Sequence, residues 1–228
     1  MINISALFSN SWKKYSANLG LCIGVFLVGT IISGILSGLT LGIVGIPIIA
    51  GLFKSFRKVQ QGQAPDFNDL FSEFNNFGKW FMVWVVLVVV IVATYALSFV
   101  FSMIPILGAF IVLAIELAVA LGIFFLFMLV LDKDLPAFEA VKSSAATVLG
   151  SLAKLAIPIL AILLFEGVLL SMLGSFVINL FNIVGVLIMA VFLPIGAIIG
   201  LVVIFLTGPW MMVARWDLYD AVYGSTKV

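Results

Sequence analysis

The chain has 228 residues, of which 64% are hydrophobic and only 9% are charged, and its formal net charge is +1. A water-soluble domain of this size exposes a large surface, which so few polar residues would not cover. The composition therefore predicts an all-helical protein packed in a lipid bilayer. The near-neutral charge gives no reason to expect a nucleic-acid partner.

Side chains for catalysis or metal binding are scarce. There is one cysteine, Cys22, and no histidine, which excludes an internal disulfide and argues against a transition-metal site. The acids of the polar segments are scattered, and "DKDLPAFE" reads as a loop leading into a helix whose dipole favours acids. No nucleophile with a base is recognisable. We expect a non-enzymatic protein with no catalytic residues, no cofactor and no metal.

Six apolar runs are candidates for membrane crossings, because about 30 Å of hydrocarbon takes roughly 20 helical residues. In chain order they are residues 19–39, 41–59, 80–103, 107–131, 155–180 and 183–207. The second is the weakest, since only 41–53 is free of charge. One helix over 19–53 would be about 50 Å long, more than one crossing needs. We therefore predict that the chain reverses at "GLTLG".

The basic residues predict the orientation of these runs. All 11 Lys and Arg lie in the N-terminal segment, in 54–79, in 132–154 or in the C-terminal segment. The intervening turns near residues 40, 105 and 182 carry no charge. By the positive-inside rule, both termini are cytoplasmic, and the expected location is the bacterial inner (cytoplasmic) membrane.

Three polar segments are expected to form amphipathic helices at the membrane surface, each ahead of a hydrophobic hairpin. They are "ISALFSNSWKKYSANLG", "FNDLFSEFNNFGKWF" and "PAFEAVKSSAATVLGSLAKL". This order suggests one membrane domain over 1–228, built from three repeat units at 1–62, 63–131 and 132–228. The motif "LFS" recurs at 7–9 and 70–72. Spans and loops that alternate without an internal repeat would look similar, so both interpretations stay open.

Small residues, proline and aromatic residues predict how the helices pack. Glycines in the first run suggest close helix contacts; they are Gly20, Gly24, Gly34, Gly38 and Gly42. Pro194 lies in the middle of the last run and predicts a kink or break there. Aromatic residues near the ends of the runs are expected to anchor the protein at the membrane interface. These are Trp12, Trp80, Trp210, Trp216 and Tyr219.

Two acids, Glu116 and Glu166, lie inside the apolar runs. Counted along straight helices from the outer ends, they lie about 13 Å and 21 Å deep. No Lys, Arg or His lies within a run to pair with them, so burial favours the protonated acids. Each acid has three interpretations: a structural hydrogen bond, for instance with Thr94, Ser98 or Ser102; exchange of a proton or cation in a transporter; or binding of a charged ligand head group.

Four segments carry a resemblance to a known group, namely "SWKKYSANLG", "KVQQGQAPDFNDLFSEF", "LPAFEAVKSSAATVLG" and "ARWDLYDAVYG". In their order they resemble the bacterial inner-membrane families grouped around the membrane domain of glycerophosphoryl diester phosphodiesterases. The resemblance implies a six-span helical membrane domain. It transfers no catalytic residues, because the soluble phosphodiesterase domain that would carry them is not part of this chain.

Two functions follow as expectations. The first is a role in membrane or lipid homeostasis, or in supporting partner proteins, with membrane lipid and either a second copy or another membrane protein as partners. The alternative is a small proton- or cation-coupled transporter that uses Glu116 and Glu166.

Overall fold

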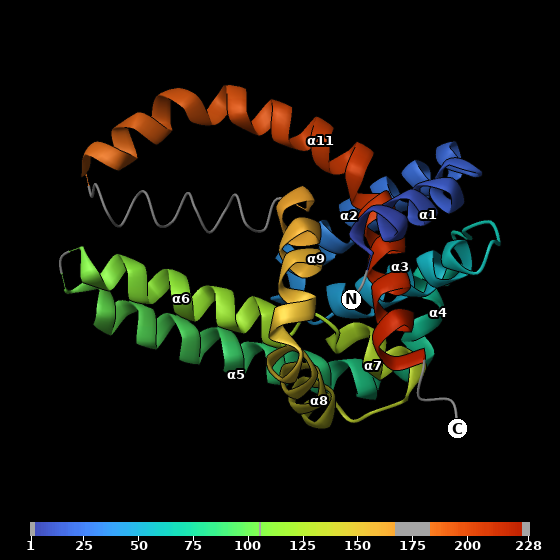
Figure 1. The fold of residues 1–228 in the computed structure, drawn as a ribbon, viewed down its shortest axis with the longest axis horizontal. Coiled ribbons are helices and arrows are strands. Elements are labelled where there is room, and N and C mark those ends of the chain that lie inside the picture. Colours follow the sequence, from blue (N-terminus) through green and yellow to red (C-terminus); the bar gives the residue numbers. More distant parts are fainter. Residues whose placement is uncertain (1–2, 105, 167–182, 225–228) are drawn as a thin grey trace.

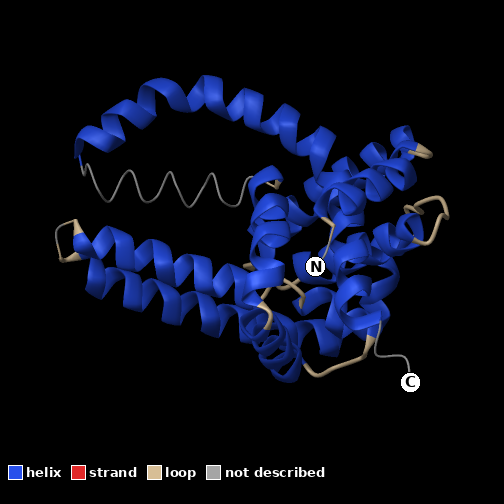
Figure 2. Ribbon diagram, in the orientation of Figure 1, coloured by secondary structure: helices blue, strands red, loops and turns tan. Residues whose placement is uncertain are grey.

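The computed structural model describes residues 3–104, 106–166 and 183–224, and the regular structure within these ranges is entirely helical (Figures 1 and 2). The helices are α1 (Ile4–Ser16), α2 (Leu19–Thr40), α3 (Gly45–Gln60), α4 (Asp69–Ser72), η1 (Glu73–Asn76), α5 (Phe77–Ser102), α6 (Leu107–Gly122), α7 (Leu126–Asp132), α8 (Ala137–Gly150), α9 (Leu152–Phe165) and α11 (Ile183–Tyr223). The three segments predicted to be amphipathic contain α1, α4 with η1, and α8.

Most of the buried core lies in a part that we call the head, made of α1, α3, α4, η1, α7, α8 and residues 208–223 of α11 (Figure 1). Helix α3 is at its centre: ten of its 16 residues are buried, and it packs against α2, α4 and α11. Its apolar residues occupy a little more than half of the circumference, and Lys54, Arg57 and Lys58 share the remaining face. The largest fully buried side chains include Trp80, Trp216, Tyr15, Tyr219 and Phe56.

Helices α5 and α6 lie side by side and extend away from the head (Figure 1). We call this hairpin the arm. Only 6% of the most apolar stretch of Asp69–Ser102 is buried, and the outward side chains of α5 are large and apolar, among them Val89, Val92, Leu97, Phe99 and Val100. An exposed apolar surface of this extent is suited to lipid rather than to water.

Three helical stretches are long and apolar enough to cross a bilayer: Leu19–Thr40, Asp69–Ser102 and Leu107–Asp132. They cover the first, third and fourth predicted runs. A fourth candidate results if Ala137–Gly150 and Leu152–Leu164, which are bent by 113° to each other, are taken as one broken span. Most of the fifth run, residues 167–180, lies outside the described residues. The sixth run is helical within α11.

The predicted reversal at "GLTLG" is confirmed. Helix α2 ends at Thr40, and the positive φ angles of Leu41 (53°) and Gly42 (89°) turn the chain so that α3 packs back along α2. Helix α3 is not among the candidate spans of the described chain. At 16 residues it is about 24 Å long, and its C-terminal half carries the basic side chains of Lys54, Arg57 and Lys58 into the head.

The glycines that bring α2 close to α3 differ from most of those that the spacing suggested. A Cβ atom on Gly20, Gly34 or Gly38 would meet open space. In contrast, a Cβ on Gly29 would lie 3.0 Å from the side chains of both Leu52 and Leu70. A Cβ on Gly45 would lie 1.8 Å from Ser37 Oγ, and its carbonyl accepts a hydrogen bond from Ser33.

Helix α11 is continuous from Ile183 to Tyr223. The helix break that Pro194 predicts therefore does not end α11, whose ribbon arches over the arm before it enters the head (Figure 1). A proline removes one backbone hydrogen bond, and membrane helices tolerate this loss where neighbouring groups or local adjustments compensate.

Candidate functional site

The first candidate site is a groove on the arm with a volume of about 260 Å³. Its lining residues are Ile91, Thr94, Tyr95 and Ser98 of α5 with Glu116, Val119, Ala120 and Ile123 of α6. On each helix the other lining positions come three, four and seven residues after the first one, so they share one face of the helix. Glu116 therefore shares the groove with three hydroxyl-bearing residues of α5, Thr94, Tyr95 and Ser98.

The polar groups of this groove are only partly satisfied. Thr94 donates a hydrogen bond of 2.7 Å to the carbonyl of Val90, whereas Ser98 Oγ is buried without any partner. Glu116 makes no hydrogen bond or ion pair within the described part of the chain. Ser102, which the sequence also offered as a partner, does not line the groove and donates to the carbonyl of Phe99. The groove thus holds an acid and a hydroxyl that both lack a partner.

Glu166 has a very different setting, because its carboxylate forms an ion pair with Arg215. This corrects the expectation that neither acid has a basic partner. Helix α9 ends at Phe165, so Glu166 lies at a helix terminus beside the head, and Arg215 comes from α11. The two side chains are only 15% and 14% exposed. The Arg215 guanidinium also lies 4.5 Å from the centre of the Phe124 ring.

The two acids therefore do not form one site. Glu116 lies on the arm between α5 and α6, and Glu166 lies beside the end of α11. Arg215 Nε is buried and has no hydrogen-bond partner among the described residues. Since a buried charge persists only when it is paired, the pair is best explained as a structural link between α9 and α11.

Most acids of the predicted cytoplasmic segments are paired with bases in the head. Asp217 accepts hydrogen bonds from Ser11, Lys14 and Gln60. Arg57 bridges Asp220 at 2.7 Å and Asp132 at 3.4 Å. Further ion pairs join Lys54 to Glu73, Lys58 to Asp69 and Lys79 to Asp134. No group of three metal-ligating side chains occurs among the described residues.

Three aromatic residues predicted as interface anchors belong to the buried core of the protein instead. Trp80, Trp216 and Tyr219 are almost completely buried. Trp80 donates to Glu73 at 2.9 Å, and Trp216 donates to the carbonyl of Phe53 at 2.8 Å. Their polar atoms thus find partners inside the protein rather than at a lipid interface.

Tyr219 donates a hydrogen bond to Asp132 at 3.0 Å. Burial raises the pKa of the Tyr219 hydroxyl, and the neighbouring Asp132 carboxylate raises it further. The hydroxyl therefore stays protonated at neutral pH and remains a hydrogen-bond donor.

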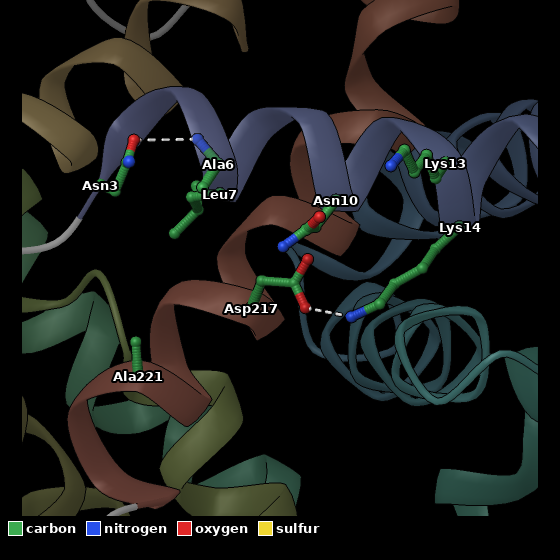
Figure 3. A pocket seen from close by; sticks show the side chains of 8 residues that line it. All are labelled: Asn3, Ala6, Leu7, Asn10, Lys13, Lys14, Asp217 and Ala221. Atoms are coloured by element: carbon green, nitrogen blue, oxygen red, sulfur yellow. Dashed lines mark hydrogen bonds and ion pairs between the residues drawn. The ribbon is translucent and has the colours of Figure 1, made fainter.

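A second groove, of about 520 Å³, lies between α1 and the end of α11 (Figure 3). It is lined by Asn3, Ala6, Leu7, Asn10, Lys13, Lys14, Asp217 and Ala221. Lys14 is bound to Asp217, whereas Lys13 has no acidic partner within the described residues. Sequence reasoning missed this groove, because nothing in the spacing shows that the two ends of the chain meet.

Two of the predicted anchor residues, Trp12 and Trp210, contact each other on the side of α1 that faces away from this groove. Trp12, next to Lys13 in α1, is 46% exposed. Its ring contacts that of Trp210 at 5.2 Å in an edge-to-face arrangement. A basic side chain beside exposed tryptophan is typical of the headgroup region of a membrane.

Comparisons with known proteins add no relative from which residue roles could be transferred. No family model matches the chain, no curated protein matches it, and no solved structure matches it. The function is therefore argued from the two grooves and the arrangement of charge.

Proposed function

We propose that the protein is a non-enzymatic module of the bacterial inner membrane that binds anionic phospholipid at the cytoplasmic face and acts in membrane or lipid homeostasis. The observation that carries this proposal is the groove between α1 and α11, where Lys13 lacks an acidic partner within the described residues, on a helix whose other side presents the exposed ring of Trp12. A lysine near an anionic membrane surface gains about 1 kcal/mol, and tryptophan favours the headgroup level. Helix α1 thus presents a lysine in the groove and a tryptophan on its other side to the membrane surface.

The proposed topology has six crossings with both termini cytoplasmic, arranged as three units of one amphipathic helix and one hairpin. The distribution of charge supports it. The ion pairs of the described residues lie in the head or at its border, whereas residues 80–131, which include most of the arm, contain a single charged residue, Glu116. The resemblance to the membrane domain of glycerophosphoryl diester phosphodiesterases favours the same layout.

The lipid proposal is tested with Lys13→Gln. Purified protein in nanodiscs of phosphatidylcholine is titrated with phosphatidylglycerol, and bound lipid is counted by native mass spectrometry. The variant is expected to bind phosphatidylglycerol about fivefold more weakly, as the loss of about 1 kcal/mol implies. Lys142→Gln is the matched control, since Lys142 is also exposed and has no acidic partner in the described chain. If both substitutions weaken phosphatidylglycerol binding equally, the groove is not the lipid-binding site.

The topology is tested by labelling single cysteines. In a Cys22→Ala background, Ile106→Cys and Lys142→Cys are treated with a membrane-impermeant thiol reagent in intact and in opened cells. The six-span layout requires labelling of the two positions from opposite sides of the membrane. Labelling of both from the same side would contradict it.

A second candidate function is a proton- or cation-coupled transporter, and one observation favours it: Glu116 shares a groove with the unpartnered hydroxyl of Ser98. Glu166 is not available for such a role, because Arg215 neutralises it. Proton and sodium flux into proteoliposomes is the test, with Glu116→Gln expected to abolish it. Flux that is unchanged by this substitution would exclude Glu116 as the coupling group.

A further inference from the structure

We propose that the groove on the arm is a self-association site, at which a second copy of the chain provides hydrogen-bond partners for Glu116 and Ser98. This inference concerns a different surface from the lipid groove of the head. It rests on the proposal that the arm crosses the bilayer, and on the polar groups that the arm leaves without partners.

Leaving Ser98 and Glu116 without hydrogen-bond partners in the membrane costs free energy. Ser98 Oγ is buried without a partner, and Glu116 has none within the described chain. In hydrocarbon, an unsatisfied polar group costs several kcal/mol. Water does not relieve this cost on a surface that faces lipid, so a partner must come from within the membrane.

The depth of Glu116 in the bilayer limits which partners can reach it. Glu116 is nine residues from the start of α6 at Leu107, which places it about 13 Å from the outer end of the arm. The hydrocarbon layer is about 30 Å thick, so the acid lies close to the middle of the bilayer. Phospholipid headgroups stay at the surface and do not reach this level. A side chain carried by another transmembrane helix does.

A twofold dimer brings the same groove of two copies together in the membrane. In a dimer with a twofold axis along the membrane normal, each residue lies at the same depth as its counterpart. Glu116 and Ser98 line one groove, and counted from the outer ends of α6 and α5 they lie about 13 Å and about 6 Å deep. Because helical side chains lean toward the N-terminus, which is the outer end of α6, Glu116 of one copy extends toward Ser98 of the other, and the reverse contact forms at the same time. The surface is self-complementary.

The chemistry of the chain agrees with a neutral contact of this kind. Residues 80–131 contain no Lys, Arg or His, so a second copy brings no cation to Glu116. A protonated Glu116 donates to the Ser98 hydroxyl, and its carbonyl oxygen accepts from the same group. Ala120 beside Glu116 is small and allows a close approach of the two α6 helices, as in other membrane helix pairs.

Disulfide cross-linking tests the geometry. In a Cys22→Ala background, Ala120→Cys lines the groove, whereas Ala118→Cys lies on the opposite, exposed face of α6 at nearly the same depth. Oxidation in native membranes is expected to produce dimers with Ala120→Cys and far fewer with Ala118→Cys. Equal cross-linking at both positions, or none at either, would overturn the proposal.

The hydrogen bonds are tested by dimer dissociation in nanodiscs or micelles, measured as energy transfer between labelled copies. Glu116→Leu removes both reciprocal bonds, and dissociation should become about tenfold to hundredfold easier. Glu116→Gln keeps a donor and an acceptor and should retain the dimer. An unchanged dimer in Glu116→Leu overturns the inference, as does a purified protein that is monomeric with lipid or another protein held at this groove. Because Lys13→Gln leaves this surface intact, its result and this one are separable.

Discussion

Removing Arg215 should destabilise the protein strongly, because its ion pair with Glu166 is largely shielded from water. The two side chains are only 14% and 15% exposed, and Arg215→Met would leave the carboxylate buried without compensation. Removing one partner of a buried pair costs about 3–5 kcal/mol. Glu166→Leu should cost a similar amount, since it leaves the guanidinium uncompensated. The double variant lacks both charges and is expected to lie within about 1 kcal/mol of the wild type.

The assay is reversible unfolding in mixed micelles, followed by tryptophan fluorescence, on the wild type, the two single variants and the double variant. A coupling energy of several kcal/mol between the two sites is the expected result. Lys79→Met serves as a control, because its partner Asp134 is 85% exposed and its loss should not be measurable. If the two single effects simply add in the double variant, the ion pair does not join α9 to α11.

Two further predictions concern the head. A Cβ on Gly51 would lie 2.4 Å from the carbonyl oxygen of Asp69, so Gly51→Ala should lower the free energy of unfolding by about 1–3 kcal/mol. Gly34→Ala should not lower it, because a Cβ there meets open space. Similar losses in the two variants would contradict the packing of α3 on α4. Because the folded state raises the pKa of Tyr219 above its ordinary 10.0, the protein should be fully stabilised below pH 10 and lose stability as the pH rises above it. Tyr219→Phe should weaken this alkaline loss in unfolding measurements, and an unaltered pH profile would refute the assignment.

The positions of the long helices followed from the sequence, because apolar length and turn residues are local properties. The stretches Leu19–Thr40 and Leu107–Asp132 agree with the predicted runs, and the chain reverses after Thr40 as expected. The role of α3 was not predictable in the same way. An apolar run looks alike whether lipid or protein surrounds it, and α3 is surrounded by the helices of the head.

For the same reason, the surroundings of Glu116 were easier to predict from the sequence than those of Glu166. The neighbours of Glu116 lie on the adjacent helix of one hairpin, so Thr94 and Ser98 could be proposed from register alone. Glu166 meets Arg215, 49 residues further along the chain. That contact depends on where α9 ends and on how α11 enters the head, and neither is a local property of the sequence.

The contact between the first and last helices governs how the protein is made. Lys14 and Asp217 are 203 residues apart, and α3 is covered by the end of α11, which is synthesised long after α3. The α5–α6 hairpin is synthesised much earlier, and its later contacts are mainly with α8. A translation product that stops before Gly208 would therefore insert its apolar hairpins yet leave the central helix uncovered. Cellular proteases that survey unfinished membrane proteins would have a clear target in such a fragment.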